Sequence, residues 1–585
     1  MFTIQIRDLA RSLAVAGLLL VAFVSPGEAG AGTLLRASIN GDGEQGDRSS
    51  FAPDLSVDGR FIAFASSASN LVPGDDNRAT DVFVRDQLTG RVERVSISSD
   101  AVAGNGRSGS PAISATGRYV VFQSSASNLV DDDANNRTDI FIHDRNRNVT
   151  ERISVGIDGG GGNGNSTSPD VSDDGRFVVF QSSASNLVEN DDNGAVDVFV
   201  YDREKHAMER VSVSSDGAQG DSSSRNASIS GDGRYVAFES SASNLVGGDS
   251  NGRADVFVRD REARLTTRVS VTSRGEQAGL GGRAPVISGD GRYVVFHSRS
   301  DDLVEDDRNE VEDVFVHDRL LGATWRVSLS SEGDEGNRRS RFAVIDASGR
   351  YVAFESDAEN LVRGDNNLLS DIFVHRLDSG GTVRISVSDQ GGEGERGSFF
   401  AAISGNGRYI AFHSSAGNLV GDDTNRATDV FLFDRLGSAT TCHGEIVTIR
   451  GTEQADIIRG TPGDDVIHGF GGNDVIYGFG GDDVICGGDG DDSLFGDEGS
   501  DRLYGDDGRD TLLGGDDDDI LQGNDGDDYI QGDRGNDVIE GLGGNDELLG
   551  NAGDDNLRGG EGDDTCRGGL GEDLASRCEI EKSIP

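Results

Sequence analysis

The sequence contains few basic residues for its size, and this shortage limits its possible partners. Its 53 Lys and Arg residues stand against 104 Asp and Glu residues, which gives a formal net charge of −51. A protein that binds nucleic acid neutralises phosphates with a basic surface, so this composition excludes nucleic acid as a partner. The excess of acidic residues is instead typical of cation binding and of high solubility.

Long apolar runs are also missing, except for one near the N-terminus. Residues 13–24 are apolar, two arginines precede them, and the small-residue stretch SPGEAGAG follows. The run is too short to cross a bilayer comfortably, because spanning needs about 20 residues. The order matches a secretory signal peptide with a cleavage site at Ala29-Gly30-Ala31, and a retained membrane anchor is the alternative. We therefore expect residues 1–31 to be removed, the mature chain to have no transmembrane segment, and the protein to be secreted, with cell-surface association left open.

The motifs of common catalytic sites are absent from the sequence. It contains no H-E-x-x-H, no G-x-S-x-G and no P-loop. Its eight histidines include three at one repeat position, His143, His317 and His375, and two at another, His297 and His413. Repeat-equivalent histidines on strands are more often packing or surface residues than general bases. Acid pairs abound, and none is marked out as a glycosidase pair, so we expect no enzymatic activity.

Glycine and aspartate, by contrast, recur with a fixed period of nine in the C-terminal part. From Gly451 to Ser576, fourteen consecutive units follow one another without insertion or deletion. Position one is Gly in all fourteen units, position four is Gly in twelve, and position eight is Ile or Leu in the first twelve. Position six is Asp in every unit: Asp456, Asp465, Asp474, Asp483, Asp492, Asp501, Asp510, Asp519, Asp528, Asp537, Asp546, Asp555, Asp564 and Asp573.

A unit of nine residues cannot bury a core of its own and must stack on its neighbours. Ordering its backbone costs about 1–2 kcal/mol per residue, whereas one buried Ile or Leu contributes only about 1.5–3 kcal/mol. An Asp in every unit widens the deficit, so a cation must enter the structure. Carboxylate and backbone carbonyl oxygens suit Ca²⁺, and the scarcity of His and Cys makes a zinc lattice an unlikely fit.

These units resemble the RTX, or haemolysin-type, calcium-binding nonapeptide G-G-x-G-x-D-x-U-x, and the unit from Gly487 to Phe495 matches it fully. The resemblance implies a parallel β-roll with two nonapeptides per turn and Ca²⁺ held between loops by the position-six Asp and by loop carbonyls. The fourteen Asp residues are then the ligand candidates, for roughly a dozen ions. RTX proteins usually leave the cell by a C-terminal signal, so the N-terminal signal is a departure. An acidic, disordered tail is the alternative.

Cysteine is confined to the same C-terminal part of the chain. The four residues are Cys442, Cys486, Cys566 and Cys578. An even number in an exported chain suggests disulfides, and three pairings are possible. We favour Cys566–Cys578, which are close in sequence at the end of the repeats, and Cys442–Cys486 across their start; free core thiols are the alternative.

The preceding part of the chain repeats with a longer period of 58 residues. The Gly-Arg pair before an aromatic residue marks seven copies: Gly59-Arg60, Gly117-Arg118, Gly175-Arg176, Gly233-Arg234, Gly291-Arg292, Gly349-Arg350 and Gly407-Arg408. The second copy predicts strands at 111–114, 118–126, 139–144 and 151–156, separated by Gly, Asn, Asp and Ser. No helical period is sustained. Seven four-stranded units indicate a β-propeller.

The fourth strand of each copy carries Arg-x-Ser, and this motif indicates how the ring closes. It occurs first at Arg36 and last at Arg384, and Cys442 stands where the next one would fall. The N-terminal strand can therefore complete the last blade and remove the open edge. The pattern "SVDGRFIAF…DVFVRD" resembles the TolB-like, WD-type propeller repeat over residues 33–440, which implies a fold and a binding role.

Every copy also contains Asp-x-Asn-x-x-x-Asp before its third strand. Oxygen ligands at relative positions 1, 3 and 7 resemble the first part of a calcium loop. An Asx-turn that caps the strand is the alternative, because turns also select Asp and Asn. The candidate residues in the first two copies are Asp75, Asn77, Asp81, Asp133, Asn135 and Asp139.

Together the patterns predict an all-β chain: a seven-bladed β-propeller followed by a parallel β-roll, a calcium-binding solenoid. The expected boundaries are a signal peptide at 1–31, the propeller at 33–440, a linker at 441–450, the β-roll at 451–576 and a C-terminal cap at 577–585. We expect a secreted calcium-binding protein whose propeller is an interaction platform for an unknown protein or glycan. The alternative is a secreted hydrolase or lyase that acts on polysaccharide, with the repeats as an export or stability module.

Overall fold

The computed structural model describes residues 32–388, 391–421, 423–435, 441–443, 445–451, 455–578 and 580–581. The expected signal peptide, residues 1–31, lies outside the described residues. Within the described ranges the chain forms strands and turns, with no helix, and so none long and apolar enough to cross a membrane. The chain divides into two compact units, Met1–Gly437 and Ser438–Pro585, and each is described by itself.

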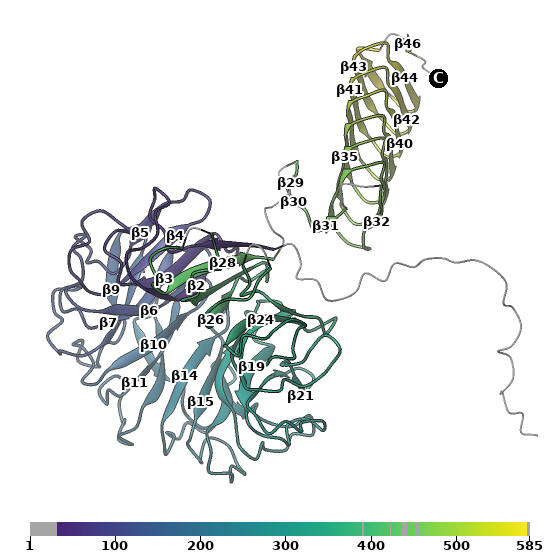
Figure 1. The fold of residues 1–585 in the computed structure, drawn as a ribbon. Helices are drawn as coiled ribbons and strands as arrows, with labels where there is room; N and C mark the ends of the chain where they lie inside the picture. Colours follow the sequence, from purple (N-terminus) through teal and green to yellow (C-terminus); the bar gives the residue numbers. More distant parts are fainter. Residues whose placement is uncertain are drawn as a thin grey trace, which may run out of the picture. The chain divides into compact units, whose positions relative to one another are not determined.

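The first unit consists of seven four-stranded antiparallel sheets, the blades of a β-propeller (Figure 1). Blades one to four comprise β2 (Ser50–Leu55), β3 (Phe61–Ser66), β4 (Asp81–Asp86) and β5 (Val92–Arg94); β6 (Ser108–Ile113), β7 (Tyr119–Ser124), β8 (Asp139–Asp144) and β9 (Val149–Arg152); β10 (Ser166–Val171), β11 (Phe177–Ser182), β12 (Asp197–Asp202) and β13 (Ala207–Arg210); and β14 (Ser224–Ile229), β15 (Tyr235–Ser240), β16 (Asp255–Asp260) and β17 (Leu265–Arg268).

Blades five to seven comprise β18 (Arg283–Ile287), β19 (Tyr293–Ser298), β20 (Asp313–Asp318) and β21 (Ala323–Arg326); β22 (Ser340–Ile345), β23 (Tyr351–Ser356), β24 (Asp371–Arg376) and β25 (Thr382–Arg384); and β26 (Ser398–Ile403), β27 (Tyr409–Ser414), β28 (Asp429–Asp434) and β1 (Thr33–Arg36). The first strands of successive blades contact one another around the whole ring, and β2 contacts β26. These first strands therefore lie innermost, and the predicted seven-bladed fold is confirmed.

Two phenylalanines from the second and third strands form the centre of each blade. In blade one, the rings of Phe64 and Phe83 lie 6.0 Å apart and are fully buried. The pair recurs in the other blades, as Phe122–Phe141, Phe180–Phe199, Phe238–Phe257, Phe296–Phe315, Phe354–Phe373 and Phe412–Phe431. Large aromatic rings bury much apolar surface each, so this pair accounts for the repeated Phe of the sequence.

The recurring Gly-Arg pair joins neighbouring blades. Arg60 forms a two-pronged contact with Asp86, with its Nε 3.0 Å from Oδ1 and a terminal nitrogen 2.8 Å from Oδ2. The Phe61 ring lies between Arg60 and Arg145 of the next blade, 4.8 and 4.4 Å from the two guanidinium carbons. Gly117 of blade two has a φ of +71°, and a Cβ there would lie 2.2 Å from this ring. Glycine is thus required at that point.

The N-terminal strand closes the ring, as the Arg-x-Ser motif predicts. Strand β1 pairs antiparallel with β28, with Leu35 opposite Leu432. Ser38, which follows the strand, donates a hydrogen bond of 2.6 Å to Oδ1 of Asp429. The last blade would otherwise leave the third strand β28 with an open edge.

The second unit consists of two parallel eight-stranded sheets that form a β-roll (Figure 1). One sheet contains β31 (Ile449–Arg450), β33 (Val466–Gly471), β35 (Val484–Asp489), β37 (Arg502–Asp507), β39 (Ile520–Asp525), β41 (Val538–Gly543), β43 (Asn556–Glu561) and β45 (Leu574–Ser576). The other contains β32 (Ile457–Arg459), β34 (Val475–Gly480), β36 (Ser493–Glu498), β38 (Thr511–Asp516), β40 (Tyr529–Arg534), β42 (Glu547–Ala552), β44 (Thr565–Leu570) and β46 (Ile580–Glu581).

Strands of the roll pair with the strand 18 residues further along, as Leu503 does with Leu521, except at the end of the roll, where Thr565 pairs with Ile580. Two nonapeptides therefore make one turn. The position-eight side chains, from Ile458 to Cys566, form one continuous buried core between the two sheets. A single aliphatic residue per nonapeptide is enough to form the buried core, because the residues on either side of it in the strand point to the other face of the sheet.

The start of the roll differs from the expected linker at 441–450. This segment contains the hairpin of β29 (Thr441–Cys442) and β30 (Glu445–Ile446), and β31 already pairs with β33. Cys442 forms a disulfide with Cys486 and is fully buried. The segment belongs to the second unit rather than bridging to it. A second disulfide joins Cys566 to Cys578, so both favoured pairings are confirmed.

Removal of β1 should destabilise the propeller. A chain that begins at residue 37 leaves the β28 edge unpaired, whereas a chain that begins at residue 32 retains β1 and serves as the control. We expect the shorter chain to melt at a lower temperature and to aggregate, because an exposed strand edge pairs with other chains. Differential scanning calorimetry and light scattering measure both effects; unchanged melting and solubility would contradict closure by β1.

Candidate metal centre

The position-six aspartates lie inside the roll, at the point where each Gly-rich loop enters the next strand. The twelve from Asp465 to Asp564 are buried, whereas Asp456 and Asp573 at the two ends are partly exposed. Acidic side chains are almost never fully buried unless they are paired. The stack therefore places an array of carboxylates where each requires a partner.

In the position-six aspartates from Asp474 to Asp573, one carboxylate oxygen is satisfied by the neighbouring turn. Oδ1 of Asp519 accepts a hydrogen bond of 2.8 Å from the backbone N–H of Asp501, one turn earlier. The same bond repeats along the roll at 2.7 to 3.1 Å, with donors from Asp456 to Asp555. These bonds fix the orientation of the twelve carboxylates from Asp474 to Asp573.

The second oxygen, Oδ2, is buried and has no hydrogen-bond partner among the described residues in ten of these aspartates. They are Asp474, Asp483, Asp492, Asp501, Asp510, Asp519, Asp528, Asp537, Asp546 and Asp555. Buried polar atoms are hydrogen-bonded in the great majority of cases. Ten equivalent exceptions in one stack mark a repeated feature of the site rather than a local irregularity.

Each Oδ2 points into a cradle beside the position-one glycine. A Cβ on Gly487 would lie 2.4 Å from Oδ2 of Asp492 and 2.7 Å from the carbonyl oxygen of Gly505. A Cβ on Gly496 would likewise lie 2.2 Å from Oδ2 of Asp501. The space is therefore closed to any side chain, and oxygens from two successive turns converge on it. This geometry explains why position one is Gly in all fourteen units.

The donor set suits Ca²⁺. The converging atoms are carboxylate and backbone carbonyl oxygens, the hard ligands that calcium takes. In the described residues no three His, Cys, Asp or Glu side chains surround one point, so a cation would take most of its ligands from the backbone. When bound, the ion supplies the positive charge that the buried Oδ2 atoms lack.

Burial raises the pKa of these carboxyl groups toward neutrality. The pKa is about 6 for Asp483, about 7 for Asp501 and about 8 for Asp519, because removal from water penalises the charged form and neighbouring carboxylates oppose it further. The hydrogen bond to Oδ1 acts in the opposite direction. Protons and calcium therefore compete for the same oxygens in the neutral pH range.

A second ladder runs along position five, which the sequence analysis did not single out. Oδ1 of Asp518 accepts a bond of 2.7 Å from the N–H of Asn536, and Oδ1 of Asp527 accepts one of 2.8 Å from Asn545. These side chains are exposed and reach forward to the next turn, whereas position six reaches back. The recurrence of Asp or Asn before the invariant Asp is the signal that could have revealed it.

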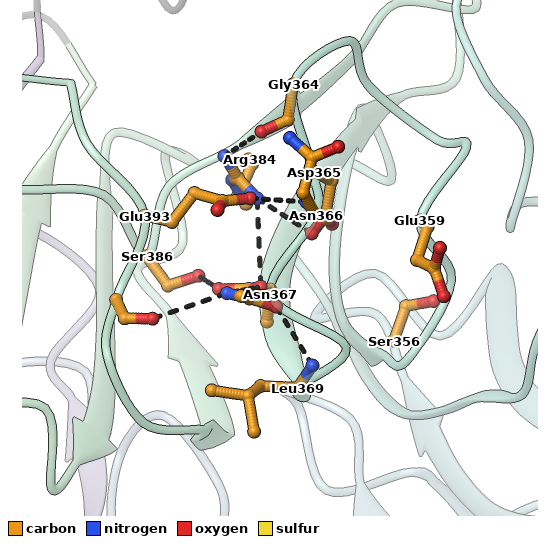
Figure 2. A network of polar contacts seen from close by, with 12 residues as sticks. Ser356, Glu359, Gly364, Asp365, Asn366, Asn367, Leu369, Arg384, Ser386 and Glu393 are labelled. Carbon is orange, nitrogen blue, oxygen red and sulfur yellow. Dashed lines mark hydrogen bonds and ion pairs between the residues drawn. The ribbon is translucent and has the colours of Figure 1, made fainter.

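The Asp-x-Asn-x-x-x-Asp loops of the propeller surround an arginine. Figure 2 shows this network in blade six, where a guanidinium nitrogen of Arg384 lies 3.0 Å from Oδ1 of Asp365. The same nitrogen lies 3.8 Å from Oδ2 of Asp371. Oδ1 of Asn367 accepts a bond of 2.9 Å from the N–H of Leu369, which closes an Asx-turn. The guanidinium occupies the position that a cation would take.

The residues singled out in the first two blades lie in the same arrangement: Asp75, Asn77, Asp81, Asp133, Asn135 and Asp139. Asn77 donates to Asp81 and Asn135 donates to Asp139, each at 2.7 Å. The equivalent arginines, each 2.9 to 4.0 Å from the first Asp of its loop, are Arg36, Arg94, Arg152, Arg210, Arg268, Arg326 and Arg384. These contacts support the turn alternative, and calcium binding by these loops stays a prediction.

The repeated histidines have structural partners. The ring Nδ1 of His143 lies 2.9 Å from the hydroxyl of Thr150, and His317 and His375 make the equivalent contact. Nδ1 of His297 accepts a long bond of 3.4 Å from the N–H of Phe342, which lies at a bulge in the inner strand of the next blade. Packing therefore accounts for both sets.

Comparison with known families identifies the C-terminal repeats. Residues 450–485, 477–512, 513–548 and 540–575 each match the RTX calcium-binding nonapeptide repeat. This part of the chain therefore consists of RTX calcium-binding repeats, folded as a parallel β-roll. Among curated proteins, no sequence matches the chain.

Solved structures similar to this chain include β-propellers. TolB from Acinetobacter baumannii is 16% identical over 60% of this chain and 66% of its own, with a TM-score of 0.32. The propeller domain of the Trilobed protease from Pyrococcus furiosus is 11% identical, covering 66% and 93%, with a TM-score of 0.41. Oligogalacturonate lyase from Vibrio parahaemolyticus is 11% identical, covering 70% and 98%, with a TM-score of 0.42. Similarity at this level carries no argument about function.

Replacement of Asp519 by Asn should affect the roll in opposite directions with and without calcium. Asn keeps the Oδ1 acceptor but replaces the charged Oδ2 with an amide. With calcium present we expect fewer bound ions and a stability loss of about 1.5–3 kcal/mol, as for a lost bond to a charged group. Without calcium the variant should be as stable as wild type or more so, because a buried charge is gone.

The exposed Asp518→Asn variant, in the same turn, is the control for this experiment. Isothermal titration calorimetry with Ca²⁺ counts the ions, and hydrogen exchange of residues 455–578 reports stability. Equal effects from both variants would show that position six has no special role.

The calcium-free roll should be more stable at pH 5 than at pH 8. The pKa of Asp519 is about 8 in the folded chain against an ordinary value of 3.8, so folding without metal takes up protons. That stability is present below about pH 4 and is lost as the pH rises through the folded-state values of about 6 to 8. Calcium affinity should rise over the same range, because calcium displaces the protons.

Hydrogen exchange in chelator, corrected for intrinsic rates, measures the first effect, and calcium titration at both pH values measures the second. Stronger protection at pH 8 than at pH 5 in chelator would contradict the competition between protons and calcium.

Proposed function

We propose that the protein is a secreted calcium-binding protein whose β-roll folds with Ca²⁺ and whose propeller is an interaction platform for a protein or glycan. The observation that carries the calcium role is the row of ten buried Oδ2 atoms without partners in the described residues. One ion for each pair of neighbouring loops on the same side gives roughly a dozen ions.

Three features support secretion. RTX repeats are typical of secreted proteins, and the chain carries them over residues 450–575. Its two disulfides, Cys442–Cys486 and Cys566–Cys578, suit an oxidising compartment. The N-terminal sequence has the order of a secretory signal peptide.

The propeller suits a binding role because its repeated polar groups already satisfy one another. The guanidinium of Arg384 is engaged by Asp365, as its equivalents are in the other blades. What differs between blades is concentrated in loops such as residues 156–165, 299–302 and 321–322. Loops on a rigid scaffold are where binding specificity usually lies.

A polysaccharide-cleaving enzyme is the alternative, and it requires unlike groups that converge at one place. Blades five to seven do depart from the sevenfold pattern. The groups that gather there are mainly arginines and aromatic rings, with His297 3.7 Å from Glu312. This composition favours binding of a ligand over acid–base cleavage.

Two measurements on the full-length, calcium-loaded protein test the proposal. An array of glycans and candidate partner proteins should yield a ligand whose binding is reduced by substitutions in the variable propeller loops, because specificity lies in loops. A screen against glycosides, esters, peptides and phosphoesters should find no turnover above background. Robust turnover that vanishes on changing a single Asp, Glu or His would overturn the binding role in favour of the enzyme.

A further inference from the structure

The sevenfold pattern is broken in blade five, beside blades four and six. Strand β18 is one residue shorter than the first strand of every other blade, and Gly282 stands where the other blades have Ser. A cavity of about 730 Å³ lies at this place, lined by Gly282 itself, by the buried His297 and by five arginines: Arg253, Arg283, Arg299, Arg338 and Arg339. The only acidic residues in its lining are Glu312 and Asp357.

Most of these arginines are not required by the fold. At the position of Arg299 five blades have Ser, and at the position of Arg253 three blades have Ala. Arg338 and Arg339 are engaged by Glu359 and Asp357. Within the described residues, Arg253, Arg283 and Arg299 form no ion pair.

The cavity is therefore a local concentration of positive charge on a strongly acidic protein. At physiological ionic strength, charges more than about 8–10 Å away are largely screened. An anion in the cavity responds to the three unpaired guanidinium groups rather than to the net charge of −51. Planar guanidinium groups match carboxylate and sulfate oxygens in two-pronged contacts.

A row of aromatic rings leads from this cavity toward the inner strands. The rings of His297 and Phe342 lie 5.4 Å apart, those of Phe342 and Phe400 5.2 Å, and those of Phe400 and His413 5.5 Å. Phe400 is 51% exposed. Part of the apolar surface of this ring is therefore open to solvent.

The two phenylalanines occupy a strained position of the repeat. Each inner strand has a bulge residue with positive φ, which is 49° at Phe342 and 52° at Phe400. The other five blades place Ala, Ser or Asn there, at Ala52, Ser110, Ser168, Asn226 and Ala284. A bulky residue in this conformation is an outlier, and strain retained against the repeat pattern points to function.

We propose that blades four to seven form a binding site for an acidic oligosaccharide, whose carboxylate or sulfate groups contact Arg253, Arg283 and Arg299 and whose sugar rings stack on Phe342 and Phe400. The arginines recognise the charge, and the aromatic row provides apolar surface for the C–H faces of the rings. This inference rests on the proposed binding role of the propeller and names the ligand class and its place.

The aromatic row distinguishes a saccharide from a small inorganic anion. Sulfate or phosphate alone would need only the guanidinium groups. A chain of sugar rings uses both parts, since His297 borders the cavity and also contacts the Phe342 ring. Contacts along two adjoining surfaces add affinity without requiring one deep pocket.

The test uses substitutions that other blades already contain, so that the variants fold. Arg253→Ala, Arg283→Thr and Arg299→Ser copy Ala195, Thr167 and Ser241 of the repeat. Phe342→Ser and Phe400→Ala copy Ser168 and Ala284. Arg137→Ala, at the position of Arg253 in blade two, is the matched control.

The full-length protein in calcium is titrated by calorimetry with trimers of glucuronic acid and of mannuronic acid, with the neutral glucose and mannose trimers, and with inorganic sulfate. We expect an acidic trimer to bind, neutral trimers not to bind, and affinity to fall as salt rises. The triple arginine variant should bind about tenfold more weakly or worse. The double phenylalanine variant should lose affinity for the trimer but not for sulfate, and the control should match wild type.

Each contrary outcome has a distinct meaning. Trimer binding unchanged in the triple arginine variant overturns this site, while the platform role of the propeller stands. Binding of sulfate without any acidic trimer overturns the saccharide assignment, as does the absence of binding to all the probes. Cleavage of a bound trimer would keep the site and overturn the non-enzymatic proposal instead.

Discussion

A buried carboxylate without a counter-charge is the constraint on which the second unit depends. Each turn of the roll buries two position-eight side chains, worth about 1.5–3 kcal/mol apiece, and two position-six aspartates. Removing an ion from water into a protein interior costs several kcal/mol even after relaxation. The two contributions are of similar size and opposite sign, so apolar burial alone does not decide whether the stack forms. Whether the stack forms is decided by the cation that binds the Oδ2 atoms.

The propeller meets the same constraint by different means. Its loops also bury an Asp before each third strand, such as Asp371. There the chain itself supplies the cation, since Arg384 and its equivalents come from the fourth strand of the same blade. The roll has only six arginines among its fourteen units, and none of those with ion pairs in the described residues contacts a position-six carboxylate. The carboxylates of the propeller are neutralised by its own arginines, whereas those of the β-roll require an external ion.

Much of the architecture could be predicted because two strict periods leave few alternatives. A period of nine with one inward aliphatic residue defines the roll. A period of 58, with an extra fourth strand at the start of the repeats and none at their end, defines the closed ring. Both disulfides followed from their proximity to the ends of the roll. The position-five ladder was missed because Asp and Asn are also common in turns without such bonds. Residues 441–450 were expected to be a linker, and their place in the second unit was missed because β31 pairs with β33 through only two residues.

The site in blades four to seven could not be found by the same reasoning, because a search for repeats gives weight to what the copies share. The shared residues proved to be structural: Arg60 holds Asp86, and the rings of Phe64 and Phe83 pack at the centre of their blade. Where the polar groups present in every blade bond to one another, only the residues that depart from the repeat are available to bind a ligand. Phe342 and Phe400 are such exceptions, since the bulge accepts smaller residues in the other five blades with less strain. In a repeat protein of this kind, departures from the pattern that carry an energetic penalty are the more informative guide to binding, and residues present in every copy are the guide to the fold.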